Sequence, residues 1–240
     1  MRQPLRVSSP SPSSWSDAGR DLALGGRCVG CERPGRVLCR GCRSALPTRA
    51  RPAWPTPTPP GLAPPWAGGD YDDVLRAMVV EHKEHGVFAL SAPLGDVLAA
   101  VVADLARGSP GEVVLVPVPS RRAVVRRRGH DPLLRLTRHA AGRLRRQGVH
   151  ASVRRALVPV VRVRDQAGLG AEERAANLAG SMACRRAPGV AAEGLLVVVD
   201  DVITTGATLR EAQRALEERG ARVDAVAAVA ATRRRVTGAR

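Results

Sequence analysis

A run of apolar residues that ends in two carboxylates carries the clearest chemistry in this sequence. Leu195 to Val199 reads Leu-Leu-Val-Val-Val and is followed directly by Asp200 and Asp201. A continuous apolar run rich in β-branched residues predicts a strand buried on both faces, as in a parallel sheet. Because two adjacent charges are costly in a core, we expect both acids to lie where the strand ends, facing a crevice at the carboxyl edge of the sheet.

The turn after the acids has the composition of a phosphate site. It is small and rich in hydroxyls, and the run from 209 to 219 that follows has helical composition. A turn that opens a helix presents backbone N–H groups and the positive end of the helix dipole, which both favour a phosphate. A buried strand with a threonine-capped helix would explain the threonines but not the tandem acids. The two carboxylates can accept hydrogen bonds from the vicinal hydroxyls of a sugar. Their position beside such a turn therefore predicts a site for a ribose 5-phosphate. The turn residues are Thr204, Thr205, Gly206, Ala207 and Thr208, and a side chain at position 206 is expected to fill the phosphate position.

Four of the five cysteines form a second cluster, with the spacing C-x2-C-x7-C-x2-C. Two C-x2-C pairs supply the four thiolates of a tetrahedral Zn²⁺ site, and four protein ligands leave no open position, so the zinc would be structural. A disulfide is the alternative, and a reducing cytosol opposes it. We expect the lone Cys184 to be a core residue. The predicted zinc ligands are Cys28, Cys31, Cys39 and Cys42.

The remaining patterns predict the elements that hold these sites. Helical periodicity at 71–84, 93–107, 132–147 and 208–219 alternates with apolar strands at 113–118, 156–161, 195–199 and 223–229. Strands that alternate with helices indicate an α/β fold with a doubly wound parallel sheet. We divide the chain into a disordered segment (1–24), a zinc knuckle (25–46), a proline-rich linker (47–69), an α/β domain (70–232) and a basic tail (233–240).

Composition limits the partners. The net charge is +16, which raises nucleic acid as a partner, but Lys83 is the only lysine and the arginine excess points to a compositional bias. The aromatic residues are one Tyr, one Phe and three Trp, few for the stacking platforms of a single-strand binder. We identify no apolar run of membrane-spanning length and no secretory signal, so we expect a cytoplasmic protein without a membrane partner.

The order of these motifs resembles the ComF/GntX family, in which a four-cysteine zinc module precedes a type I phosphoribosyltransferase-like domain. Residues 195–208 resemble the phosphoribosyl-diphosphate (PRPP) signature of that class. The family's Pro-Val-Pro segment before an arginine-rich Arg-Gly stretch is similar to 117–129, and its Gln-x-Gly-Leu…Arg…Asn loop is similar to 166–177. A family lysine corresponds to Lys83, whereas the family's aromatic residues after that lysine and after Arg-Gly are replaced here by Glu84 and by His130-Asp131.

This resemblance implies a phosphoribosyltransferase that takes PRPP with Mg²⁺ and transfers the phosphoribosyl group to or from a nitrogen acceptor. Asp200 and Asp201 would be catalytic: they would hold the ribose hydroxyls and stabilise the positive charge that develops on the sugar. A loop that closes over PRPP would exclude water. The implied diphosphate loop is Val118, Pro119, Ser120 and Arg121, and the implied flexible loop contains Arg164, Gln166 and Arg174.

Two other functions stay open at this point. The ComF likeness implies a competence-related factor that handles DNA, and the same pocket would serve a PRPP or nucleotide sensor without turnover. The expected partners are therefore PRPP or a nucleoside monophosphate, weakly bound single-stranded DNA or competence-machinery proteins, and a second copy of the chain in a homodimer. The sequence names no acceptor.

Overall fold

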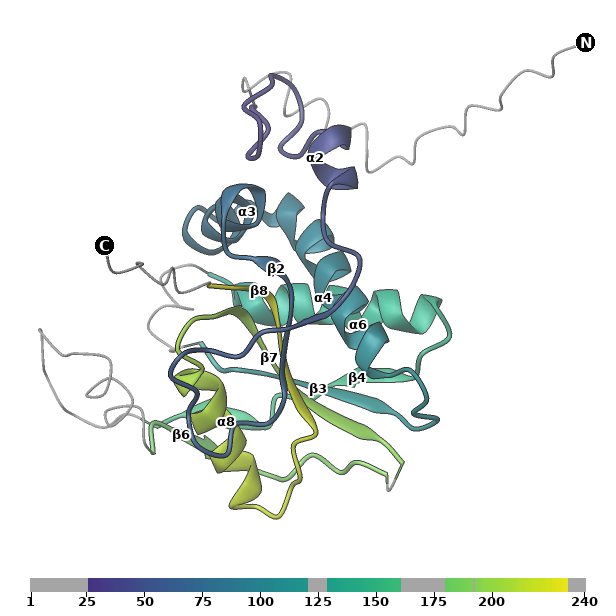
Figure 1. The fold of residues 1–240 in the computed structure, drawn as a ribbon, viewed down its shortest axis with the longest axis vertical. Helices are drawn as coiled ribbons and strands as arrows, with labels where there is room; N and C mark the ends of the chain where they lie inside the picture. The colour runs from purple at the N-terminus through teal and green to yellow at the C-terminus, as the bar shows by residue number, and fades with distance from the viewer. Residues whose placement is uncertain (1–25, 121–128, 161–179, 192, 233–240) are drawn as a thin grey trace, which may run out of the picture.

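A six-stranded, mostly parallel sheet forms the centre of the protein in the computed structural model, which describes residues 26–120, 129–160, 180–191 and 193–232 (Figure 1). The strand order is β1-β2-β8-β7-β3-β4, in which only the β1–β2 pair is antiparallel. The predicted α/β class with a parallel sheet is confirmed. The strands are β1 (Arg51–Pro52), β2 (Pro65–Asp70), β3 (Val113–Pro117), β4 (Ala151–Val153), β7 (Leu195–Ile203) and β8 (Ala225–Ala231).

Helices cover both faces of this sheet. On one face α4 packs against β2, β8 and α6, and on the other face α8 packs against β7 (Figure 1). Gly68 of β2 is required by this packing, because a Cβ there would lie 2.4 Å from a methyl group of Val97 in α4. The larger helices begin and end within two residues of the predicted bounds. Within the described part of the domain the helices are α3 (Asp73–Glu84), the 3₁₀ turn η1 (Phe88–Leu90), α4 (Ser91–Leu105), α6 (Pro132–Arg146) and α8 (Ala207–Glu217).

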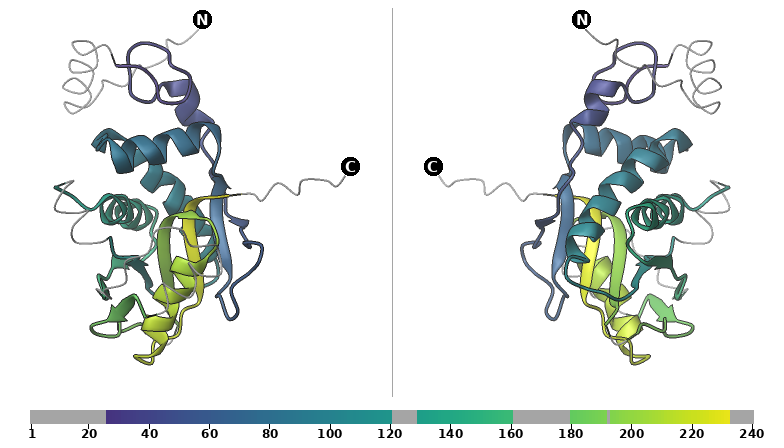
Figure 2. Two further views of the ribbon diagram at one scale, coloured as in Figure 1. Left: turned by 90° about the vertical axis from the view of Figure 1, so that its left-hand side faces the viewer. Right: turned by 90° about the vertical axis from the view of Figure 1, so that its right-hand side faces the viewer.

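The carboxyl ends of the four central strands meet at one edge of the sheet, because β2, β8, β7 and β3 are mutually parallel. Helix α3 follows β2 closely and lies across this edge in every view (Figures 1 and 2). Its buried face has helical spacing and consists of Leu75, Met78, Val79 and His82. The helix therefore forms a cover over the end of the sheet where ligands of open α/β folds bind.

A separate two-stranded antiparallel sheet contains β5 (Leu157–Pro159) and β6 (Met182–Cys184). The strand predicted at 156–161 thus lies outside the main sheet. The edge of the main sheet is formed instead by β4, which has only three residues and is too short to be recognised from the sequence pattern. Buried Glu211 of α8 accepts from the backbone N–H of Met182 at 3.0 Å and pairs with Arg214 at 2.7 Å, and this network attaches β6 to α8. Cys184 is buried in the core, as predicted.

The segment predicted as a proline-rich linker, 47–69, is part of the folded domain. Its last residues form β2, which pairs with β8, and β1 pairs with β2 in turn. The intervening prolines lie against α8, where Gln213 accepts from the N–H of Ala63 at 2.9 Å and donates to the carbonyl of Gly61 at 2.9 Å (Figure 1). Sequence composition suggests an extended linker, but these backbone groups find partners on a helix that lies 150 residues further along the chain.

One stretch is long and apolar enough to cross a membrane by length and composition: the 18 residues Phe88–Leu105, which comprise η1 and α4. The expectation that no apolar run has this length is therefore wrong. More than half of the stretch is buried in the core, where α4 packs against the sheet and against α6. A core helix that is buried on several sides needs an apolar sequence, just as a membrane-spanning helix does. The apolar composition of this stretch is therefore explained by the fold.

Candidate functional site

The two predicted acids lie within β7 rather than beyond its end. The strand continues to Ile203, because its pairing with β8 continues as far as Ala231. On the other side β3 ends earlier: its last residue, Pro117, pairs with Val199. From Asp200 onward no strand among the described residues lies beside β7 on the β3 side, so both acids reach the crevice from inside a strand.

A cavity of about 550 Å³ occupies this edge of the sheet. Both acids line it, together with residues of the phosphate turn and of the predicted diphosphate loop. The diphosphate loop, which is distant in the sequence, therefore meets the acids and the adjoining phosphate turn in one cavity, where we expected a single site. Of the predicted site residues, those that line the cavity are Val118, Pro119, Ser120, Asp200, Asp201, Thr204 and Thr208.

Lys83, at the end of α3, is the charge partner of the acids. Its Nζ lies 2.7 Å from Oδ2 of Asp201, whose side chain is 12% exposed. Burial alone would lower the pKa of Lys83, but the carboxylate of Asp201 raises it above its ordinary value. Burial raises the pKa of Asp200 well above its usual range, and the charge of Asp201 raises it further. The cavity thus holds one lysine against two close carboxylates, and donors such as ribose hydroxyls would relieve the repulsion.

The turn from Thr204 opens α8, an 11-residue helix whose first N–H groups have no partner within the helix. Gly206 is the N-cap residue and has a φ of 73°, which glycine adopts without strain. A Cβ at Gly206 would lie 3.0 Å from Pro55. The expectation that a side chain at position 206 fills the phosphate position is therefore wrong, because it would point toward the proline segment. Thr205 and Ala207 also lie in the turn, where Oγ1 of Thr205 accepts from the N–H of Ala207 at 3.4 Å.

The diphosphate loop is held by the start of α6. Oγ of Ser120 donates to Oδ1 of Asp131 at 3.2 Å, and the same carboxylate caps α6 by accepting from the N–H of Leu134 at 3.1 Å. Val118 is fixed as well, since its N–H donates to the carbonyl of Val199 at 3.0 Å. The loop therefore has a defined backbone course as far as Ser120. Arg121 and the flexible-loop residues Arg164, Gln166 and Arg174 lie outside the described residues.

A second cavity of about 400 Å³ adjoins the first, because Val118, Pro119 and Ser120 line both. Arg155, just before β5, and Arg185, just after β6, lie at the same end of the small antiparallel sheet and line the other side of this cavity. Two guanidinium groups facing a loop beside the acidic site form a region suited to anions. No signal in the sequence marks these two residues, since they are not distinguishable from the other arginines of a strongly basic chain.

Most of the other lining residues that sequence reasoning missed come from the N-terminal side of the cavity; the rest are Pro132, Leu133 and Val202. Tyr71, which follows β2, and Val79, Val80 and Glu84 of α3 line the wall opposite the acids. Lys83 is identified in the sequence only through the resemblance. The sequence could not predict this wall, because its residues lie far along the chain from both the phosphate turn and the diphosphate loop.

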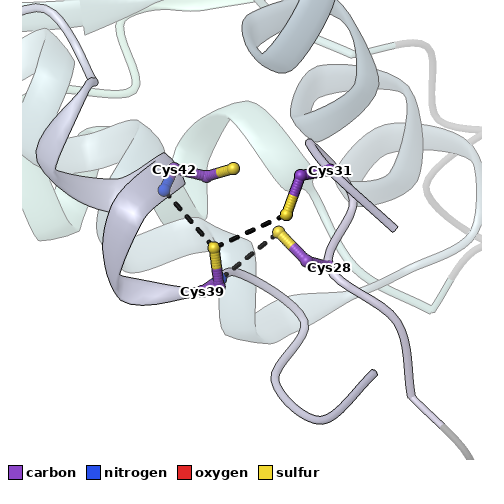
Figure 3. Close-up of side chains that lie close together, drawn as sticks. All are labelled: Cys28, Cys31, Cys39 and Cys42. Carbon is purple, nitrogen blue, oxygen red and sulfur yellow. Dashed lines mark hydrogen bonds between the residues drawn. The ribbon is translucent and has the colours of Figure 1, made fainter. Parts of the chain in front are cut away.

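The four N-terminal cysteines converge as predicted (Figure 3). Their sulfur atoms all lie within 4.8 Å of one another, and Sγ of Cys31 lies 3.7 Å from Sγ of Cys39. Tetrahedral Zn–S bonds of about 2.3 Å place two sulfur ligands about 3.8 Å apart, so the cluster fits Zn²⁺. Backbone N–H groups point at two of the sulfurs: Cys39 donates to Cys28 at 3.3 Å and Cys42 donates to Cys39 at 3.4 Å. None of the five cysteines forms a disulfide, and all lie in the described part of the chain.

The cysteine module is attached to α4 and to α3, the second of which borders the cavity. Short helix α2 (Arg40–Ser44) carries Arg43, whose guanidinium lies 3.1 Å from Asp96 of α4. Gly30 packs so closely on α3 that a Cβ there would lie 3.0 Å from Val74. Neighbouring apolar side chains of the module, such as Val29, pack against the domain core. The module therefore rests on the amino-terminal part of α3, whose other end carries Lys83.

Comparison with known proteins gives one positive result. The family profile described as "phosphoribosyl transferase domain" matches residues 100–238. The match begins within α4 and includes the acids, the turn and the diphosphate loop, but neither β2 nor α3. No curated protein matches the chain.

Proposed function

The chain belongs to the phosphoribosyl transferase domain family, and from this premise we propose that its acid-lined cavity binds PRPP or a related ribose 5-phosphate compound. The observation that supports the proposal best is the convergence of three elements in one cavity: the β7 acids, the phosphate turn and the diphosphate loop. A ribose 5-phosphate needs a phosphate cradle next to hydroxyl acceptors, and the cavity offers both.

The reaction that fits is transfer of the phosphoribosyl group to or from a nitrogen acceptor. Asp200 and Asp201 would accept hydrogen bonds from the ribose hydroxyls, and their charge would stabilise the cationic sugar as the bond from C1 to the diphosphate breaks. Thr204 and Thr208, with the N–H groups at the start of α8, would hold the 5-phosphate. Backbone groups of the diphosphate loop, with Arg155 and Arg185 in the adjoining cavity, would hold the leaving group.

The donor atoms also fit Mg²⁺, which prefers carboxylate and phosphate oxygens. Asp200 and Asp201 would hold the ion together with the oxygens of the ligand, and it would offset the charge of the diphosphate. Lys83 would hold the carboxylate of Asp201 in position in the free protein, because its Nζ lies 2.7 Å from Oδ2 of that residue. The narrower ComF/GntX resemblance supports an assignment of the cysteine cluster to structural zinc, next to a domain of this class.

Titration calorimetry with PRPP and Mg²⁺ on Asp200→Asn and Asp201→Asn variants tests this function. Asparagine keeps the shape but removes the charge, so we expect binding to weaken a few-fold while PRPP-dependent diphosphate release falls by about 10²–10³. Asp224→Asn is the matched control: this carboxylate lies at the other end of β7, where it accepts from Leu196 at 2.9 Å. Wild-type protein that binds neither PRPP nor ribose 5-phosphate would refute the proposal.

Two other results would favour a different function. If PRPP binds but no candidate base or amine releases diphosphate, the cavity belongs to a sensor without turnover. The DNA-handling alternative is supported by the net charge of +16. Affinity for a single-stranded oligonucleotide that persists at physiological salt would favour it, whereas binding through charge alone falls steeply as salt rises.

A further inference from the structure

The cysteine module makes two contacts with the domain that the proposed function does not use. On one side, Arg43 of the module pairs with Asp96 of α4 at 3.1 Å, and α4 belongs to the core, where it packs against the sheet and α6. On the other side, Gly30 packs against Val74 in the first turn of α3. The module is therefore fixed to the core and also touches the helix that covers the ligand cavity (Figures 1 and 2).

Gly30 lies between a cysteine sulfur and α3. A Cβ at this position would lie 3.0 Å from Sγ of Cys42 and 3.0 Å from a methyl group of Val74. Cys42 belongs to the cluster that fits Zn²⁺, and no residue of the module's helix α2 is buried. A module without a core of its own folds when its thiolates share a metal ion. We therefore expect Gly30 to press on Val74 only while the cluster is loaded.

The start of α3 has little stability of its own. Its first residue, Asp73, has a φ of 34°, a conformation that is strained in any residue other than glycine. Within the described part of the chain, the N-cap residue Asp72 makes no side-chain hydrogen bond that caps the helix. The contact between the module and Val74 therefore helps to hold the first turn of α3 in place.

The other end of α3 reaches the ligand cavity. Lys83 lines this cavity, and its Nζ lies 2.7 Å from Oδ2 of Asp201. Nine positions separate Lys83 from Val74, which corresponds to about 14 Å along a helix. A packed helix is a rigid element that carries a displacement from one end to the other. A shift of the first turn therefore changes the position of Lys83 relative to the acids.

We propose that the cysteine module positions Lys83 through α3, so that zinc occupancy at the module is coupled to ligand affinity at the acids. The ligand in this inference, ribose 5-phosphate with Mg²⁺, rests on the proposed function. While the module is folded against Val74, Lys83 holds the carboxylate of Asp201 in position for a ribose hydroxyl. When the module unfolds, Asp201 loses this partner and the affinity falls. Because coupling between two sites is reciprocal, the ligand must raise the zinc affinity by the same factor.

Titration calorimetry with ribose 5-phosphate and Mg²⁺, on the full chain loaded with zinc and stripped of it, measures the coupling. We expect the stripped protein to bind the ligand about five- to tenfold more weakly, a coupling of ordinary size between two sites. Equilibrium competition with a chromophoric zinc chelator supplies the reverse measurement. Saturating ribose 5-phosphate should raise the apparent zinc affinity by the same factor. Circular dichroism monitors whether the stripped chain stays folded.

Val74→Ala tests the path while zinc stays bound. This truncation removes the methyl groups that face Gly30 but no metal ligand, so the zinc content should not change while ligand affinity falls about threefold or more. Lys83→Met removes the charge at the other end of α3. If Lys83 carries the effect, the double variant should bind no more weakly than Lys83→Met alone. Val149→Ala is the matched control: this valine is also partly buried against the core, lines neither cavity and should not affect ligand affinity.

Each contrary result has a distinct meaning. If folded protein binds ribose 5-phosphate equally well with and without zinc, the coupling is overturned while the proposed function stands. If the stripped chain is unfolded, loaded Val74→Ala decides, and wild-type affinity in that variant overturns the inference. Additive effects of Val74→Ala and Lys83→Met, or an equal loss in Val149→Ala, overturn it as well. If the loaded wild type binds neither ribose 5-phosphate nor PRPP, the proposed function fails and the inference fails with it.

Discussion

Acid should destabilise this protein through one buried histidine under the cavity wall. His82 of α3 is 2% exposed, and its Nε2 lies 2.8 Å from Oγ of Ser91. Burial lowers its pKa from 6.5 to about 4; the charges of His130 and Arg135 act in the same direction, and the carboxylate of Asp201 opposes them in part. The unfolded chain therefore binds a proton on this side chain at a pH where the folded protein does not.

The size of the effect is set by the two pKa values. A group whose pKa is lowered by folding contributes stability that is fully present above the unfolded pKa and is lost as the pH falls toward the folded one. The difference between a pKa of 6.5 in the unfolded chain and about 4 in the folded protein corresponds to about 3 kcal/mol of unfolding free energy in total. By pH 5 about 2 kcal/mol of this should already be lost relative to pH 7.5.

Urea unfolding at pH 5 and pH 7.5 measures this loss. We compare wild-type protein with His82→Gln, in which an amide can still bond to Ser91 but does not titrate. The drop in free energy of unfolding between the two pH values should be about 2 kcal/mol smaller in the variant than in the wild type. His150→Gln is the matched control, because His150 is exposed, and it should keep the wild-type drop. The reasoning is refuted if wild type and His82→Gln lose the same free energy within about 0.5 kcal/mol.

Two further predictions concern the metal and the turn. Protein purified without added metal should contain one zinc per chain by elemental analysis, Cys31→Ser should lower this content, and Cys184→Ser should not; zinc far below one equivalent in the wild type would contradict the site. Gly206→Ala should destabilise the protein by about 2 kcal/mol in thermal or urea unfolding, because it combines a φ of 73° with a Cβ that meets Pro55 at 3.0 Å. Gly220→Ala, at a similar φ but with nothing within 4 Å of its Cβ, should cost only about 1 kcal/mol, and equal losses would show that the contact with Pro55 has no effect.

The sequence by itself determined those parts of the site that are local in the chain. An apolar run followed by Asp200 and Asp201, and then by a small hydroxyl-rich turn, predicts a strand, a crevice and a helix start, because each of these depends on residues within a few positions. The cysteine cluster was predictable for the same reason. Two C-x2-C pairs joined by a short spacer can converge without help from the rest of the fold.

Tertiary structure decided what depends on register and on the crossing of distant elements. The acids lie inside β7 and are still accessible because β3 ends opposite Val199, which no pattern within β7 reveals. Tyr71 and Lys83 belong to the site because β2 pairs with β8 and α3 then crosses the sheet edge, although more than 100 residues separate them from the acids. Their residue types are ordinary in isolation. Only the packing of an N-terminal helix over a C-terminal strand turns a tyrosine and a lysine into a cavity wall.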